Sequence, residues 1–244
     1  MPENTLLELR AITKRFGQVV IADDVSLAVS PGDSVGIVGP NGAGKTSLFG
    51  LISGDLTPNA GKVIFAGNNV TKLDSAARTR LGIGRTYQVP RPFTDMTVFE
   101  NVLVAAQQGG GLRRAASYAR AGECLERTGM AKVANTPTGR LGLLQRKRLE
   151  IARALAPGPQ LLLLDEVAGG LTDAECGELI EIIRGILAEG TAVIWIEHVV
   201  RALTQVAERL LCLYGGHFIG DGDPATVMNS PEVREVYLGS EVKA

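Results

Sequence analysis

The sequence has few of the residues that build disulfide frameworks or metal clusters. Among its 244 residues are three cysteines, two histidines and one tryptophan. The cysteines, Cys124, Cys176 and Cys212, are odd in number, far apart, and lack the short spacing of a metal site. We therefore expect small buried thiols in a reducing compartment rather than disulfide bonds.

A charge excess and long apolar runs are also missing. The net charge is −1, whereas proteins dedicated to nucleic acid usually carry a basic excess, so we expect no nucleic-acid partner. A bilayer-spanning helix needs about 20 consecutive apolar residues, and the runs 161–164 and 192–196 are far shorter. The opening residues, Met-Pro-Glu-Asn-Thr, are not expected to form a signal peptide. Any role at a membrane is therefore expected to depend on a partner.

A glycine-rich run follows a short apolar run in the first quarter of the chain. Residues 35–38 are Val-Gly-Ile-Val, residues 39–46 are Gly-Pro-Asn-Gly-Ala-Gly-Lys-Thr, and a helix-like stretch follows at 47–52. Strand, loop and helix in this order, with the spacing G-x-x-x-x-G-K-T, are typical of a nucleotide phosphate site. Backbone N–H groups at a helix N-terminus hold an anion well, and glycines let the backbone approach it closely.

This run predicts a phosphate site and part of a metal site. We expect the ammonium of Lys45 on the β and γ phosphates of ATP and the hydroxyl of Thr46 on Mg²⁺. The other loop residues expected to contact the nucleotide are Gly39, Asn41, Gly42, Ala43, Gly44 and Ser47. The alternative, a glycine-rich turn that binds nothing, is disfavoured by the strand before the run and the Lys-Thr pair within it.

Two carboxylates follow a second buried run. The four leucines at 161–164 end in Asp165 and Glu166. A carboxylate at the tip of a buried strand can reach Mg²⁺ held by Thr46, so Asp165 is the expected metal ligand. Glu166 is then placed to polarise a water in line with the γ phosphate. An Asp-Glu pair at a strand end is common, and it acquires this meaning only beside the phosphate loop.

Two further polar residues are candidates whose functional and ordinary interpretations both stay open. His198 follows the apolar run 192–196, where it could bond the γ phosphate and hold the attacking water. Gln88 precedes the helical region, and its amide oxygen could bind Mg²⁺ or orient water. Taken alone, they are an ordinary strand-end histidine and a surface glutamine.

The order of apolar runs predicts a parallel-strand α/β core interrupted by helices. Strand-like runs disappear between residues 98 and 156, where Ala, Leu, Arg and Glu dominate. The expected strands are 6–10, 19–29, 35–38, 62–66, 161–164, 192–196 and 210–214, and the expected helices outside the insertion include 174–189, 200–209 and 231–239.

The chain resembles ABC-type ATPases. The phosphate loop, Gln88, the segments 141–155 and 161–166, and His198 have the order and spacing of that family over nearly the whole chain. Finer features resemble the ATP-binding subunit of branched-chain amino acid importers: the segments 82–88, 98–102, 148–155 and 231–239. Importers of amides or urea and lipopolysaccharide-export ATPases look similar. The resemblance implies a P-loop NTPase core with a parallel sheet, an N-terminal antiparallel β subdomain and an inserted helical subdomain.

The resemblance also implies domain limits, roles and partners. The single ABC ATPase domain would comprise 1–97 and 157–244 as core and 98–156 as helical subdomain. Phe16 would stack on adenine, with a core side chain as its alternative, and Gln88 would sense Mg²⁺. Glu166 would be the catalytic base, His198 the switch histidine and 89–100 the surface that meets the membrane partner. Expected partners are transmembrane permease subunits, a second ABC ATPase subunit and, indirectly, a periplasmic or extracellular solute-binding protein. The location implied is the cytoplasmic face of the inner or plasma membrane.

One family motif is altered. The signature loop of such ATPases reads Leu-Ser-Gly-Gly-Gln, whereas residues 141–145 read Leu-Gly-Leu-Leu-Gln. Gly142 and Gln145 are expected to contact the nucleotide of the partner subunit. Loss of the serine hydroxyl removes a hydrogen bond to a charged group, worth about 1.5–3 kcal/mol, and Leu144 adds bulk where the backbone should approach phosphate. We expect a heterodimer with one competent and one impaired ATP site.

These observations leave two alternatives to an ATP-hydrolysing transporter subunit. A weakly catalytic regulatory partner is favoured by the altered signature and disfavoured by intact Lys45, Asp165, Glu166 and His198. A soluble ABC protein of translation or DNA repair is disfavoured, because such proteins generally carry two ATPase modules or a long coiled-coil insertion.

Overall fold

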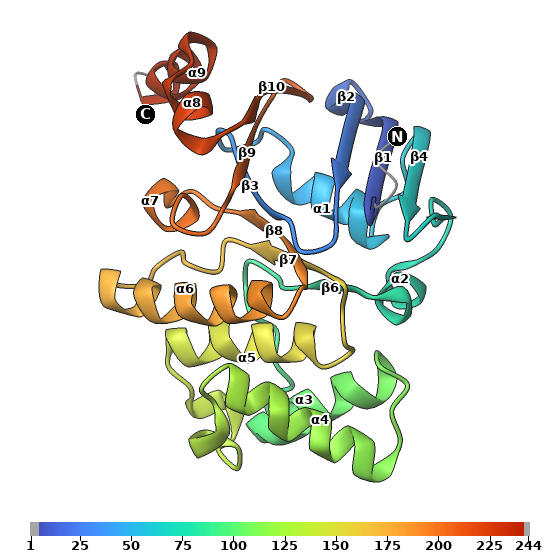
Figure 1. Cartoon of the computed structure of the whole chain (residues 1–244), viewed down its shortest axis with the longest axis vertical. Coiled ribbons are helices and arrows are strands. Elements are labelled where there is room, and N and C mark those ends of the chain that lie inside the picture. Colours follow the sequence, from blue (N-terminus) through green and yellow to red (C-terminus); the bar gives the residue numbers. More distant parts are fainter. Residues whose placement is uncertain (1–4, 242–244) are drawn as a thin grey trace.

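The computed structural model describes residues 5–241 of the chain, with side chains described through residue 236. The larger of two sheets has the strand order β10-β9-β3-β8-β7-β6 (Figure 1). Its strands are β3 (Ser34–Val38), β6 (Ile83–Arg85), β7 (Leu161–Asp165), β8 (Ala192–Ile196), β9 (Arg209–Tyr214) and β10 (His217–Gly222). All neighbours pair in parallel except β10, which is antiparallel to β9. Every residue of β3, β7 and β8 is buried, which explains their continuous apolar sequences.

The smaller sheet is antiparallel and lies beside α1 near the N-terminal end (Figure 1). Its order is β2-β1-β4-β5, with β1 (Leu7–Phe16), β2 (Val19–Val29), β4 (Ala60–Phe65) and β5 (Asn68–Asn69). The helix α1 (Lys45–Ser53) follows β3, and α2 (Ser75–Leu81) precedes β6. The predicted fold class, a P-loop core with a parallel sheet and an N-terminal antiparallel sheet, is confirmed.

Helices form the end of the molecule opposite the antiparallel sheet (Figure 1). Within 98–156, all of which the structure describes, the regular elements are helical: α3 (Val98–Gln108), α4 (Arg114–Arg127), α5 (Leu143–Leu155) and the 3₁₀ turns Ala131–Val133 and Thr138–Arg140. The later helices are α6 (Asp173–Ala188), α7 (Val200–Leu203), α8 (Pro224–Asn229) and α9 (Pro231–Glu241). In the described part of the chain, no helix combines the length and apolar character needed to cross a bilayer.

The buried strands separate two apolar cores. Leu161 and Leu163 of β7 pack in the core shared with α1 and the smaller sheet, whereas Leu162 and Leu164 pack in the core shared with α3–α6. Successive side chains of a strand point to opposite faces, so one run of leucines supplies both cores. Cys124, Cys176 and Cys212 are free and buried, as expected.

One predicted helix is wrong in extent. The apolar pattern predicted a helix over 200–209, but α7 ends at Leu203 and Arg209 begins β9. Arg209 pairs with Val35 of β3 and forms ion pairs of 2.6 and 2.7 Å with Asp221 of β10, so the sheet holds it. The elements α2, β5, β6, β10 and α8 were not predicted. His217 is the first residue of β10.

Parallel pairing brings the candidate residues to one edge of the larger sheet. The phosphate loop follows the carboxyl end of β3, Asp165 ends β7, and Glu197 and His198 follow β8. Asp165 and Ile37 both pair with Ile196, so these three strand ends lie at the same level. Ligands of open parallel sheets bind at this edge.

Candidate functional site

The phosphate loop has a backbone that favours glycine at three positions. Gly39, Gly42 and Gly44 have φ angles of 149°, 82° and 98°. A Cβ at residue 39 would lie 2.2 Å from the carbonyl oxygen of Leu213, and one at residue 44 would lie 2.9 Å from that of Ile21. Gly39 and Gly44 are therefore required by close packing as well as by backbone conformation. Gly44 caps α1, whose first N–H groups open toward the loop.

Lys45 lies across its own loop. Its side chain is buried, and Nζ donates hydrogen bonds to the carbonyl oxygens of Gly39 at 2.7 Å and Pro40 at 3.1 Å. Burial lowers the pKa of Lys45, while the charges of Glu166 and Asp165 act in the opposite direction. An anion bound at the loop would supply the countercharge that this ammonium lacks.

An open cavity of about 360 Å³ lies at the loop. Its lining unites the phosphate loop with three residues that are distant in the sequence, Gln88, Glu166 and His198. The loop contributes Asn41, Gly42, Ala43, Gly44, Lys45, Thr46 and Ser47, and Ile21 completes the wall. Of the sequence-predicted residues, Gly39, Asp165, Phe16, Gly142 and Gln145 are not part of this lining.

Glu166 contacts both of the other distant residues, Gln88 and His198. Its carboxylate accepts a hydrogen bond of 2.5 Å from Nε2 of Gln88 and lies 2.6 Å from Nε2 of His198. Its backbone has a φ of 49°, a left-handed conformation that costs a residue with a Cβ about 1–2 kcal/mol. Such strain is typical of functional sites. A carboxylate held between an amide and an imidazole, beside a phosphate loop, is positioned to bind a water.

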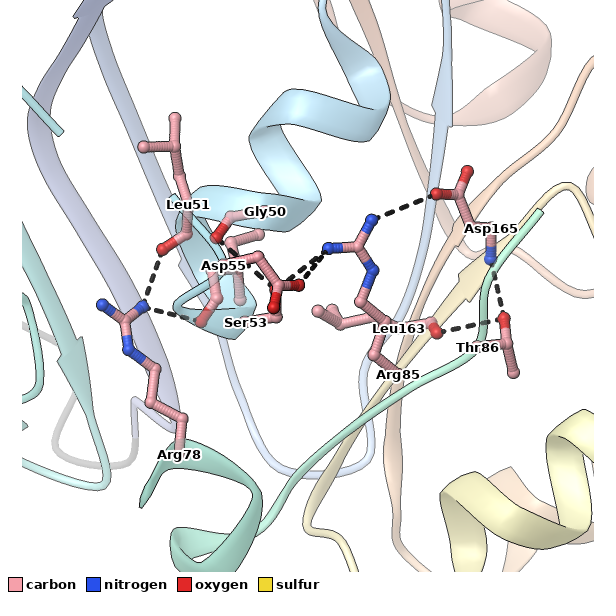
Figure 2. A network of polar contacts seen from close by, with 10 residues as sticks. Gly50, Leu51, Ser53, Asp55, Arg78, Arg85, Thr86, Leu163 and Asp165 are labelled. Carbon is pink, nitrogen blue, oxygen red and sulfur yellow. Dashed lines mark hydrogen bonds and ion pairs between the residues drawn. The ribbon is translucent and has the colours of Figure 1, made fainter. Parts of the chain in front are cut away.

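Asp165 is the last residue of β7 and is not part of the cavity lining (Figure 2). Its carboxylate is buried; Oδ2 is 3.4 Å from the guanidinium of Arg85, while Oδ1 has no hydrogen-bond partner. Its N–H donates to the hydroxyl of Thr86 at 3.0 Å. Burial raises the pKa of Asp165, and Arg85 opposes that rise.

The orphan oxygen of Asp165 fits a metal site. The described residues contain no cluster of three His, Cys, Asp or Glu side chains, so a resident transition metal has no ligand set here. Mg²⁺ prefers oxygens and is commonly bound by one or two carboxylates together with phosphates and waters. Asp165, the exposed hydroxyl of Thr46 and the amide of Gln88 are donors of that kind.

Two arginines bind the C-terminal end of α1, and no sequence motif indicated a role for either (Figure 2). Arg85 links Asp165 to the far end of α1, because its Nη1 donates to Ser53 at 3.0 Å and to Asp55 at 2.8 Å. Arg78 is 1% exposed and caps the last turn of α1 by donating to the carbonyls of residues 51 and 52 at 2.7 and 2.8 Å. The cationic groups complement the negative end of the helix dipole.

Glu197 is a further buried carboxylate beside the site. It accepts hydrogen bonds from the N–H groups of Ala168 at 2.6 Å, His198 at 3.1 Å and Val199 at 3.4 Å. It therefore ties the segment after Glu166 to the segment that carries His198. Burial raises the pKa of Glu197, and these three hydrogen bonds partly oppose the rise.

Phe16 stands apart from the cavity lining at the end of β1. Its side chain is 47% exposed, so the alternative of a core side chain is wrong. The ammonium of Lys14 lies 4.8 Å from the centre of its ring. An exposed ring is available for stacking on a base, and its role there stays a prediction.

The altered signature segment forms the start of α5. Gly142 is the N-cap residue, and its N–H donates to the side-chain oxygen of Gln145 at 3.2 Å. Leu143 is 46% exposed. Gly142 has no side chain with which to cap the helix. It therefore offers no hydroxyl donor where the family's signature has a serine.

Exposed apolar side chains lie on both sides of Gln88 in the sequence. Tyr87, Val89 and Phe93 are exposed by 41%, 68% and 49%. Nearby, a pocket of about 200 Å³ lies between the core, at Arg85 and Tyr87, and the helices α3 and α5. Apolar exposure of this kind marks contact surfaces.

The chain matches known families over most of its length. A family model described as ABC transporter matches residues 22–169, and one described as branched-chain amino acid ATP-binding cassette transporter matches residues 219–243. The high-affinity branched-chain amino acid transport ATP-binding protein LivG of Escherichia coli K12 is 35% identical, over 96% of this chain and 98% of LivG. BraF of Pseudomonas aeruginosa, with the same description, is 32% identical at the same coverage. The lipopolysaccharide export ATP-binding protein LptB of Acidithiobacillus ferridurans is 34% identical over 97% and 98% of the two chains.

Solved structures of ATP-binding cassettes also resemble the chain over most of its length. A nucleotide-free ATP-binding cassette from an ABC transporter has a TM-score of 0.87 and 28% identity, covering 96% of this chain and 98% of that one. The ADP conformation of such a cassette has the same score and identity, covering 96% and 99%. A dimeric bacterial ABC transporter cassette has a TM-score of 0.81 and 25% identity, covering 90% and 99%.

Proposed function

The chain belongs to the ABC transporter family and is an ATP-binding cassette ATPase, and on that premise we propose that it powers the uptake of branched-chain amino acids or related small polar solutes, such as amides or urea. The observation that carries the ATPase assignment to particular residues is the cavity that unites the phosphate loop with Gln88, Glu166 and His198. The descriptions of LivG and BraF and the match at residues 219–243 support the cargo.

The proposed ATP site uses this chain's own residues as follows. Lys45 and the N–H groups of the loop bind the phosphates, and the exposed ring of Phe16 stacks on adenine. Glu166 polarises the attacking water as general base, and His198 holds that water and the γ phosphate. Their mutual distance of 2.6 Å supports joint action on one water.

Thr46, Asp165 and Gln88 are the proposed ligands of Mg²⁺. The buried Oδ1 of Asp165, which has no hydrogen-bond partner, supports this assignment most directly. Bound there, the ion would neutralise charge on the β and γ phosphates. Gln88 also contacts Glu166, so one side chain links the metal ligands to the proposed base.

The whole chain, 1–244, is proposed to be one ABC ATPase domain, with 98–156 as its helical subdomain. The exposed apolar side chains near Gln88 and the adjoining pocket support 89–100 as the surface for transmembrane permease subunits. The chain would then sit at the cytoplasmic face of the membrane through those permeases. A solute-binding protein would act on it indirectly.

We propose a heterodimer in which this chain lends its partner a weak signature loop. The partner's loop would complete the ATP site of this chain, where Lys45, Asp165, Glu166 and His198 are all present. The reverse contact would rely on Gly142 and Gln145, without a serine hydroxyl. The exposed position of Leu143 at the start of α5 supports an outward-facing loop.

Binding of a fluorescent ATP analogue to the purified chain tests the nucleotide site. We expect saturable, Mg²⁺-dependent binding by the wild type and loss of it in Lys45→Ala. Equal binding by both proteins, or binding by neither, would refute the proposed site. Turnover of the isolated chain at rates typical of the family would refute the asymmetric heterodimer, because a homodimer would carry the altered loop twice.

The similarity to LptB favours lipopolysaccharide export as the second candidate function. Affinity purification of the tagged chain from membranes, followed by identification of its companions, separates the two candidates. Permeases co-purified with a second ATPase, whose ATPase activity rises with a solute-loaded binding protein, would support import. Co-purified lipopolysaccharide and stimulation by it would support export instead.

A further inference from the structure

Lys147 is a buried lysine to which the proposed ATP site assigns no role. It is the fifth residue of α5, and its side chain is 5% exposed. Its ammonium donates hydrogen bonds to two main-chain carbonyls, that of Glu166 at 2.7 Å and that of Gln88 at 3.4 Å. A buried ammonium is stable only where such acceptors surround it.

These two carbonyls belong to residues whose side chains also meet. Nε2 of Gln88 donates to the carboxylate of Glu166 at 2.5 Å on the cavity side. Gln88 and Glu166 are therefore joined twice: through their side chains at the cavity, and through their main-chain carbonyls by Lys147. The bridge comes from the helical segment, whereas Glu166 follows a strand of the core.

The bridge acts on a strained residue. Glu166 has a φ of 49°, and such a conformation persists only where several contacts fix it. Its N–H donates to the carbonyl of Ile196 at 2.9 Å, and its carbonyl accepts from the N–H of Gly169 at 3.4 Å. The ammonium of Lys147 donates to the same carbonyl, and this hydrogen bond is short and charged.

We propose that Lys147 is a positioning residue that holds Glu166 in its left-handed conformation and thereby aims the carboxylate at Gln88 and His198. This inference rests on the proposed role of Glu166 in ATP hydrolysis. Because Lys147 lies four residues after the start of α5, a displacement of the signature segment 141–145 reaches Glu166 through this side chain.

Three variants test the proposal. Lys147→Met removes the ammonium and keeps the length of the side chain, and Lys147→Arg keeps a charged donor. Lys132→Met is the matched control, because Lys132 is an exposed lysine of the same helical segment. Thermal unfolding of each variant identifies any general loss of stability.

Amide hydrogen exchange of the nucleotide-free protein reports on the conformation around Glu166 and does not depend on ATPase activity. The N–H groups of Glu166, Ala168 and Gly169 are all hydrogen-bonded in the wild type. We expect their exchange to accelerate about tenfold or more in Lys147→Met, to stay close to wild type in Lys147→Arg, and to be unchanged in Lys132→Met. Unchanged exchange in Lys147→Met would overturn the proposal. Faster exchange over the whole chain in Lys147→Met would overturn it too, because that indicates general unfolding rather than a local loss of the Glu166 conformation.

Steady-state ATPase assays of the same proteins read the consequence for the reaction. We expect kcat of Lys147→Met to fall about tenfold or more, with KM and analogue binding within about twofold of wild type and most activity restored in Lys147→Arg. A fall in binding equal to the fall in kcat, or no fall in kcat despite faster exchange, would overturn the positioning role. Absence of ATP binding by the wild type would instead refute the proposed function, while the exchange measurement still decides whether Lys147 holds Glu166.

Discussion

Glu166 and His198 lie 2.6 Å apart, although they follow different strands of the sheet. The parallel pairing of β7 with β8 places both residues at the same edge. Hydrogen bonds of Glu197 to the N–H groups of Ala168 and His198 fasten the two segments together. The contact therefore follows from the pairing of the two strands and from the buried carboxylate of Glu197.

Replacing Glu166 by Gln should abolish most hydrolysis while leaving nucleotide binding nearly intact. Positioned general bases contribute about 10²–10⁴-fold to rates, so we expect kcat to fall by about that factor. The amide of glutamine preserves the size of the side chain and a contact with Gln88. Single-turnover ATP cleavage together with analogue binding measures both effects. A parallel loss of binding would mean that Glu166 holds the nucleotide rather than the water.

Alanine at Gly39 should be far more damaging than alanine at Gly42. Both residues have positive φ, but a Cβ at residue 39 would lie 2.2 Å from the carbonyl of Leu213, whereas residue 42 faces open space. We expect Gly42→Ala to cost about 1–2 kcal/mol of unfolding free energy and Gly39→Ala to exceed that and to abolish ATP binding. Urea unfolding and analogue titration of both variants compare them directly. Equal effects would show that the loop adapts to the added methyl group.

Restoring the family's signature should accelerate hydrolysis by the isolated chain. In Gly142→Ser with Leu144→Gly, a hydroxyl again faces the partner's phosphate and the backbone can approach it. A hydrogen bond to a charged group is worth about 1.5–3 kcal/mol, so we expect turnover to rise about ten- to hundredfold. Gly139→Ser, a glycine with no neighbour near its added Cβ, is the control. No acceleration would mean that some other feature limits the homodimer.

Much of the fold was predictable because local patterns and topology agree. The continuous apolar runs 161–164 and 192–196 predicted buried strands, and both form β7 and β8 of the parallel sheet. The helix expected over 200–209 is shorter in the structure, because Arg209 belongs to β9 and is held there by ion pairs with Asp221 of β10. The strand β10 was not expected from the sequence, so this interaction could not be foreseen.

The site was predictable only where chemistry follows a motif. The phosphate loop, Asp165 and Glu166 stand next to recognisable strands, so their convergence could be inferred. The roles of Arg78 and Lys147 could not, because each binds main-chain carbonyls that are remote in sequence, and carbonyls carry no sequence signal. Such contacts could be suspected from the sequence only where a cation stands on the apolar face of an amphipathic helix.

The buried carboxylate of Glu197 should make stability depend on pH. Burial raises its pKa above the ordinary 4.5, so the folded protein holds this proton more tightly than the unfolded chain does. The associated stability is complete at low pH and is lost as the pH rises from about 4.5 through the raised pKa. The nearby charges are those of Glu166, which favours the protonated form, and Lys147, which opposes it.

Glu197→Gln removes this titration. Its amide has only one oxygen, so it cannot accept both from Ala168, as Oε1 does, and from His198 and Val199, as Oε2 does, which lowers stability by an amount that does not vary with pH. Relative to wild type, the unfolding free energy of Glu197→Gln should therefore shift in favour of the variant as the pH rises from about 4.5 through the raised pKa of Glu197. Urea unfolding across that range measures the shift, with Glu126→Gln, an exposed carboxylate of α4, as the control for loss of one negative charge. A difference between Glu197→Gln and wild type that stays constant with pH would show that the carboxylate is already ionised at the low end, and that its three hydrogen bonds outweigh its burial.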